Sequence, residues 1–124
     1  MLSQNQMVRF RRQIEKLYDS VCTVVVAQEQ ILDNGVSTFV DKIILENQPC
    51  RISQQSITQA NNNGAVTEVD KVISLYIAPE VEIPTGSRIM VTYNDITDEY
   101  RRTGIPSRYD TYQKIQLEYV GRWI

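Results

Sequence analysis

The sequence predicts a mainly β protein, a small antiparallel β-barrel or sandwich of about six strands with an N-terminal α-helix and two long loops. Three observations lead to this fold class. Apolar and polar residues alternate with a period of two in several predicted strands after residue 20. The connections are hairpin-like, without crossover helices, which favours antiparallel pairing. Helical spacing dominates only near the N-terminus, and 124 residues fit a single domain, residues 1–124.

Residues 3–18 are predicted to form the helix. Ser3 and Gln6 fit a capping box, in which each side chain satisfies a free backbone amide of the first turn. Apolar residues recur at helical spacing and predict one buried stripe, formed by Met7, Phe10, Ile14, Leu17 and Tyr18. Four cations occupy much of the remaining surface, which is either a solvated face or a face for an acidic neighbour: Arg9, Arg11, Arg12 and Lys16.

Residues 21–124 are predicted to form the β body. The β-branched run at residues 24–26 favours a first strand over 21–32. Asn34-Gly35 predicts a type I′ hairpin turn, and residues 36–47 should return as the second strand. Pro49 is expected to interrupt pairing before a further short strand begins at Cys50.

Three later strands alternate clearly. They are expected at residues 71–78, 88–93 and 112–124, because every second residue in each is apolar or aromatic. Ile73, Leu75 and Ile77 are predicted to share one face of their strand, and Ile89, Val91 and Tyr93 one face of theirs. In the last strand, the residues predicted to face inward are Ile115, Leu117 and Tyr119.

Two long loops are expected between these strands. Residues 53–70 are amide-rich, and neither Lys nor Arg occurs between Arg51 and Lys71. Residues 94–111 mix arginines with carboxylates. Loops of this length in a compact domain are usually functional or disordered.

The composition argues against catalysis. The chain has no histidine, the commonest general base and metal ligand, and it has no phosphate-binding glycine motif. We therefore expect no enzyme activity, no cofactor and no metal. Cys22 and Cys50 are expected to be reduced, buried thiols, although their pairing is left open. No apolar run approaches the roughly 20 residues of a membrane span, so we expect a soluble, intracellular product without membrane contact.

Nucleic-acid binding is the alternative function. A small barrel of the OB type stacks bases on exposed aromatic residues within a basic groove. The net charge of −2 argues against it. Five tyrosines nevertheless lie on or beside predicted strands: Tyr76, Tyr93, Tyr109, Tyr112 and Tyr119.

An ordered series of short motifs runs through the second half of the chain. It comprises Pro49-Cys50-Arg51-Ile52-Ser53, Leu75-x-Ile77-x-Pro79, Ile83-Pro84-x-Gly86-Ser87, Thr97-x-Glu99-Tyr100, Gly104-x-Pro106-x-x-Tyr109 and Arg122-Trp123. The series resembles the minor capsid, or head-closure, proteins of tailed bacteriophages, and the resemblance covers roughly residues 17–124.

The resemblance implies a head-completion, or stopper, protein of the virion. Such proteins assemble in the host cytoplasm as a homo-oligomeric ring below the portal or its adaptor, close the DNA channel and provide the tail attachment surface. The implied partners are other copies of the chain, the portal or adaptor, and tail-completion or tail-tube proteins. Double-stranded DNA would pass nearby without specific binding.

The resemblance also assigns candidate site residues. The 53–70 loop would face the channel and gate it, through Gln54, Gln55, Gln59, Asn61, Asn62, Asn63, Gly64, Glu68 and Asp70. The residues assigned to ring contacts are Arg9, Arg11, Arg12, Lys16, Glu99, Arg101, Arg102 and Arg108.

Overall fold

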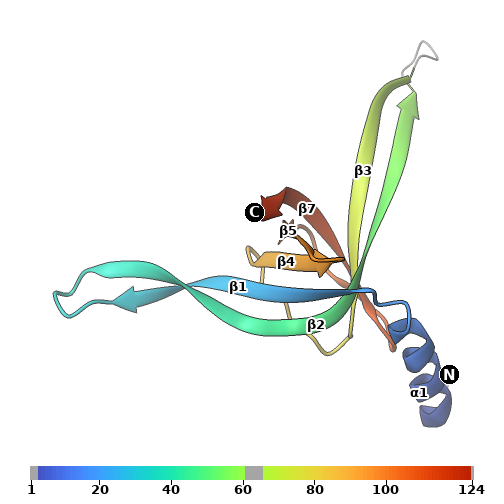
Figure 1. The fold of residues 1–124 in the computed structure, drawn as a ribbon, viewed down its shortest axis with the longest axis horizontal. Coiled ribbons are helices and arrows are strands. Elements are labelled where there is room, and N and C mark those ends of the chain that lie inside the picture. The colour runs from blue at the N-terminus through green and yellow to red at the C-terminus, as the bar shows by residue number, and fades with distance from the viewer. Residues whose placement is uncertain (1–2, 61–65, 124) are drawn as a thin grey trace.

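The computed structural model describes residues 3–60 and 66–123, with side chains outside residues 57–70. Within these ranges the chain forms one helix and seven strands, which confirms the predicted fold class (Figure 1). In chain order they are α1 (Gln4–Glu15), β1 (Ser20–Ile31), β2 (Ser37–Ala60), β3 (Val66–Ile77), β4 (Arg88–Tyr93), β5 (Ile96–Arg102), β6 (Ser107–Arg108) and β7 (Gln113–Trp123).

The strands form one antiparallel sheet that closes on itself. Its order is β3-β2-β1-β4-β5-β7-β6, and β3 also pairs with β7. Residues 73–77 of β3 pair with residues 113–117 of β7, while β6 adds only two pairs beside β7. The hydrogen-bonded ring therefore runs through β1, β2, β3, β7, β5 and β4, as in a small barrel.

The core lies inside this ring. Most residues of the three predicted apolar faces are buried, including Leu75, Ile89 and Ile115. The prediction that Tyr119 faces inward is wrong, because Tyr119, like Tyr93, is about half exposed beyond the packed interior. Three further residues are also buried, although no apolar face predicted from the sequence contained them: Tyr100, Ile83 and Gln113. Cys22 and Cys50 are free thiols in the core.

The predicted break at Pro49 is wrong, because β2 continues through it. Pro49 lies opposite Val21, beside a register shift between Cys22 and Val24. Asn47 adopts a positive φ of 53°, which Asn tolerates better than most residues. An irregular position of this kind accommodates a proline, which has no N–H to donate to the ladder.

The predicted 53–70 loop is also wrong. β2 extends to Ala60 and β3 begins at Val66, so these residues form a long hairpin whose tip, 61–65, lies outside the described residues. β-branched residues such as Ile57, Thr58 and Val69 suit paired strands. An amide-rich composition led to a loop prediction, although exposed strands also tolerate amides.

Two hairpin arms therefore leave the closed sheet. In the β1–β2 arm (residues 26–42) the two strands pair only with each other, and the same holds for the β2–β3 arm (residues 55–72). Figure 1 shows the two arms projecting in different directions, with β2 passing from one into the other.

Turn geometry corrects two further predictions. The β1–β2 turn is not type I′, because only Gly35 has a positive φ (82°), and Gly35 N–H donates to Leu32 at 2.9 Å. It is a three-residue loop with glycine in the left-handed position. The predicted 94–111 loop contains β5 and β6. Asn94 and Asp95, with φ of 49° and 64°, form a two-residue turn of type I′ geometry between β4 and β5.

Helix α1 begins at the predicted capping box, since Ser3 and Gln6 exchange both hydrogen bonds. It ends at Glu15, earlier than predicted, and none of its residues is buried. The predicted stripe is therefore not part of the core: Phe10 is 48% exposed and Leu17 is 56% exposed. Figure 1 shows the helix standing at one end of the molecule, away from the β1–β2 arm.

Candidate interaction surfaces

The β2–β3 arm carries the residues predicted to gate a channel. Gln54 and Gln55 lie in β2, and both are exposed. Gln59 lies opposite Glu68 in the register, and Asp70 lies opposite Ile57. The remaining four candidates lie outside the described residues: Asn61, Asn62, Asn63 and Gly64. Gln55, Gln59, Glu68 and Asp70 thus lie in the projecting hairpin, whereas Gln54 lies just before it, opposite Ile73 of the closed sheet.

The cationic helix is attached to the body through Arg11. Its guanidinium pairs with Glu15 one turn along the helix and with Glu80 after β3. Those two partners raise the pKa of Arg11, whereas the hydrogen bond from Arg11 lowers the pKa of Glu80. Arg9, Arg12 and Lys16 are exposed and form no ion pair among the described residues.

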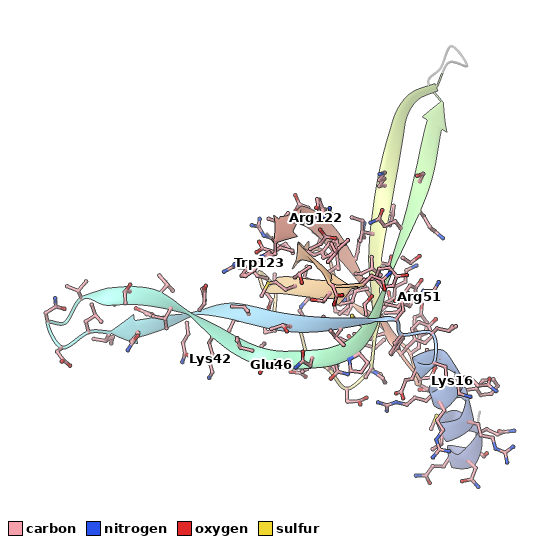
Figure 2. All side chains as sticks on the ribbon, viewed as in Figure 1. Lys16, Lys42, Glu46, Arg51, Arg122 and Trp123 are labelled. Carbon is pink, nitrogen blue, oxygen red and sulfur yellow. The ribbon has the colours of Figure 1, made fainter. Side chains whose placement is uncertain are left out.

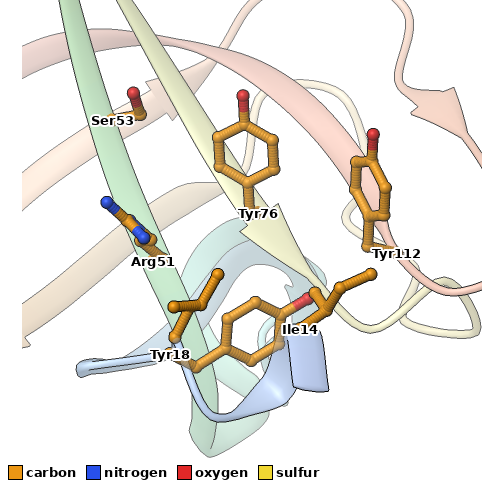
Figure 3. A pocket seen from close by; sticks show the side chains of 7 residues that line it. Ile14, Tyr18, Arg51, Ser53, Tyr76 and Tyr112 are labelled. Carbon is orange, nitrogen blue, oxygen red and sulfur yellow. The ribbon is translucent and has the colours of Figure 1, made fainter. Parts of the chain in front are cut away.

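A pocket of about 240 Å³ lies where the helix meets the sheet (Figure 3). Its lining is mostly apolar and aromatic and comes from the end of the helix and the residues after it, β2, β3 and the residue before β7: Ile14, Leu17, Tyr18, Arg51, Ser53, Tyr76 and Tyr112. Burial raises the pKa of Tyr18 to about 12. The sequence analysis did not identify this pocket, because its residues come from four separate segments.

Aromatic rings continue from this pocket along the sheet. The centroid of Tyr112 lies 5.8 Å from that of Tyr76 and 4.8 Å from that of Tyr109. Lys114 Nζ lies 5.9 Å from the centre of the Tyr76 ring, within the range of a cation–π contact. Together with Arg51, these residues make the pocket rim aromatic and positively charged.

The other predicted contact residues do not form one cluster. Glu99 accepts a hydrogen bond from the indole N–H of Trp123 at 3.0 Å and pairs with Arg88 at 3.1 Å. The hydrogen bond from Trp123, followed by that from Arg88, lowers the pKa of Glu99. Arg102 donates to the backbone oxygens of Ile83 and Gly104. The side chains of Glu99 and Arg102 therefore stabilise the fold, whereas those of Arg101 and Arg108 are exposed.

The β1–β2 arm is an apolar surface that the sequence analysis did not identify as functional. Ile31 is 73% exposed and Phe39 is 70% exposed. Figure 2 shows side chains standing on both sides of the ribbon, with no other element covering it. The signal in the sequence was a strand pattern with apolar residues at both odd and even positions. Such a pattern is typical of a strand with two buried faces. In the described part of this chain, however, no other element covers the arm.

One face of this arm combines apolar and acidic residues. Because residues directly opposite share a face, Glu29 lies beside Phe39, and Ala27 lies beside Asp41. Alternation places Ile31 and Ile43 on the same side. We call this the acidic apolar face: Glu29, Ile31, Phe39, Asp41 and Ile43.

The described residues also bear on membrane insertion and on metal binding. No helix in residues 3–60 and 66–123 is long and apolar enough to cross a membrane. Over the same part of the chain, no group of three or more His, Cys, Asp or Glu side chains is placed to hold a metal ion.

These features define a class of protein: a small closed antiparallel β-sheet with two hairpin arms and one loosely attached helix. No protein-family model matches the chain, and no curated protein matches it. Among solved structures, it is similar to the phage-like element PBSX protein xkdH from Bacillus subtilis. The TM-score is 0.47 at 11% sequence identity, over 81% of this chain and 93% of that one.

Proposed function

We propose that the protein is a structural component of the neck of a tailed bacteriophage. In this proposal it forms a ring below the portal or adaptor, closes the DNA channel and provides a surface for tail attachment. The proposal starts from the motif series in the sequence. The β2–β3 arm is the single structural observation that carries it furthest, because this arm projects from the sheet and its two strands pair only with each other.

The chemistry of the β2–β3 arm suits a gate for DNA. Residues 52–70 contain no Lys or Arg and two carboxylates, Glu68 and Asp70. Cations on a gate would hold phosphates through counterion release and slow the passage of DNA. Amide side chains such as Gln55 and Gln59 offer hydrogen bonds without positive charge. An arm of this composition closes a channel by its bulk and still releases DNA.

A ring also needs two different contact faces on each subunit. Heterologous contacts between such faces generate closed rings when the rotation between subunits closes. The helix and the β1–β2 arm are two exposed surfaces at opposite ends of the molecule, which supports this kind of assembly.

Localisation in purified virions tests the proposal. Cryo-electron microscopy of tailed particles that carry an epitope-tagged copy of the chain should show a labelled ring between the portal and the tail. Absence of the chain from mature particles would overturn the proposal. Turnover of a substrate by the purified chain would equally contradict a purely structural role.

Nucleic-acid binding is a second candidate, because one observation favours it. Tyr76, Tyr109 and Tyr112 cluster beside Arg51 and Lys114, and bases stack on such aromatic platforms. A gel-shift titration with single-stranded DNA at physiological salt tests this function. Tight binding by a monomer that is lost in Tyr112→Ala would favour it over the structural role.

A further inference from the structure

The β1–β2 arm has a surface that its own chain does not cover. A two-stranded hairpin is marginally stable in water by itself, and residues 26–42 pair only with each other. The acidic apolar face nevertheless exposes Ile31, Phe39 and Ile43. Exposed apolar side chains gathered in one place usually mark an interaction site.

Helix α1 presents a complementary surface. Phe10 and Leu17 are exposed along its apolar stripe, next to the pocket described above. Residues 4–16 carry four cations and one carboxylate, a net charge of +3. The β1–β2 arm carries three carboxylates and one lysine, a net charge of −2. The two apolar surfaces therefore have opposite charge.

The helix and the arm cannot meet within one chain, because they lie at opposite ends of the molecule (Figure 1). Two copies placed head to tail would bring them together. Such a contact joins different faces of identical subunits and repeats from copy to copy, as a ring requires.

We propose that the β1–β2 arm of one copy docks on helix α1 of the next copy, with Phe39 seated in the pocket at the base of that helix. At about 240 Å³ the pocket is smaller than the roughly 300–1,000 Å³ of typical small-molecule sites, and it suits a side chain. Tyr76, Tyr112 and Arg51 provide aromatic and cation–π contacts for an inserted ring.

The position of Glu29 adds charge pairing to this anchor. Glu29 lies directly beside Phe39 on the same face of the arm, so it enters the contact with the ring. Arg9, Arg12 and Lys16 have no ion pair among the described residues and line the helix nearby. A buried aromatic anchor with charged residues around it is the usual anatomy of a specific interface.

Disulfide trapping between two tagged copies tests the contact. Ile31→Cys, beside Phe39 on the same face, is introduced in one copy and Leu17→Cys in the other, so that the Phe39 anchor is kept, and the mixture is oxidised mildly. Native Cys22 and Cys50 are buried and should not compete. We expect a covalent dimer between the two variants. The matched control pairs Ile31→Cys with Ile105→Cys, since Ile105 is 89% exposed on a different surface. No dimer, or an equal yield with the control, would overturn the proposal.

Charge reversal provides a second test in the same assay. Reversing Arg9, Arg12 and Lys16 to Glu in the Leu17→Cys copy should lower the trapping yield about tenfold at low salt. Reversing Glu29 and Asp33 to Lys in the other copy should restore the yield. Lys42→Glu, on the opposite face of the arm, should have little effect. A reversed helix that is trapped as efficiently as the native one would contradict the contact.

This inference deepens the proposed ring assembly, and the two can fail separately. If trapping fails while virions show the chain as a ring, the subunits associate through another surface. If trapping succeeds while the chain is absent from virions, the contact is real and the proposed place in the neck is wrong.

Discussion

The guanidinium of Arg88 lies 3.0 Å from the carboxylate of Asp41 and links the closed sheet to the base of the β1–β2 arm. Arg88 is on β4, and it also pairs with Glu99 of β5 at 3.1 Å. Glu99 in turn accepts the indole N–H of Trp123. A series of polar contacts therefore runs from the last strand through the sheet to the β1–β2 arm.

Replacing Arg88 by alanine should loosen the β1–β2 arm more than it destabilises the fold. Partly exposed ion pairs contribute little, so we expect a loss of about 1 kcal/mol in the free energy of unfolding. Amide hydrogen exchange should become faster in residues 26–31 and 37–42, because the arm loses its link to β4. Asp41→Asn removes only the contact with the arm and should reproduce the faster exchange. Unchanged exchange in both variants would contradict this role.

The lowered pKa of Glu99 predicts how the free energy of unfolding changes at acid pH. The folded protein favours the ionised form, so the contribution of Glu99 is complete above its ordinary pKa of 4.5. It is lost as the pH falls through the lowered folded value, where the carboxylate becomes protonated. Urea unfolding between neutral pH and about pH 3 should therefore show a weaker pH dependence in Glu99→Gln. Glu118→Gln, on the exposed side of β7, is the control, and an equal change there would argue against a specific effect.

The buried amide of Gln113 should matter for stability. Its Nε2 donates to the backbone oxygen of Ala78 at 2.8 Å and also to that of Val81. Gln113→Leu leaves both carbonyls without this donor, which should cost about 1–3 kcal/mol in the free energy of unfolding. Gln116→Leu, at an exposed position on the same strand, should change stability little. Denaturant unfolding of both variants measures the difference, and similar values would contradict a specific role for Gln113.

The regular parts of the fold follow from local sequence signals. The capping box located the start of α1, and alternation identified Leu75, Ile89 and Ile115 as core residues. These predictions succeeded because each depends on a few neighbouring residues. Tyr93 and Tyr119 continue the same alternation but extend past the packed interior. Alternation tells which residues share a face, and it does not tell how far the core extends along a strand.

The two long loops were mispredicted for different reasons. Asn94-Asp95 adopts a two-residue turn through positive φ at both residues, and the Asn-Asp pair between two apolar runs was the missed signal. The β2–β3 arm was predicted as a loop because its sequence is rich in amides and does not alternate. Its backbone nevertheless pairs as two strands, which contact no third strand in the sheet.

The candidate surfaces depend on long-range contacts, which a single sequence does not show. Nothing in the sequence indicated that Arg11 pairs with Glu80 or that Arg102 supports the backbone at Ile83. The arginines could be grouped only by composition. The structure separates those with an internal partner from those that are exposed, such as Arg12 and Arg108.

Cys22 and Cys50 should be unreactive in the folded protein. Hydrogen bonding between the two thiols, together with burial, raises the pKa of the Cys50 thiol far above its ordinary value. The thiolate is the reactive form, so alkylation by iodoacetamide at neutral pH should require unfolding. Mass spectrometry should find no modification of the native protein and two modifications in urea. Rapid modification under native conditions would show that this part of the core opens easily.

The last prediction concerns the β2–β3 arm and the retention of packaged DNA. Residues 57–70 can be removed as a matched piece, with Ser56 joined to Lys71 through an Asn-Gly turn, because these two residues are opposite each other in the register. The fold should survive, since the deleted residues pair with no third strand. If the arm closes the channel, particles with the shortened arm should assemble and then lose their genomes. DNase protection and the fraction of full heads in micrographs measure this loss.

A charge variant distinguishes closure of the channel from electrostatic binding of DNA by the arm. Gln55 is exposed on the arm, and Gln55→Arg adds a cation where the native segment has none. A ring would present this charge several times, so DNA should leave more slowly at low salt and at a nearly normal rate at high salt. Gln55→Ser keeps the position neutral and serves as the control. Two results together would place the arm away from the path of the DNA. Particles with the shortened arm would retain DNA normally, and Gln55→Arg would leave the rate of DNA ejection unchanged.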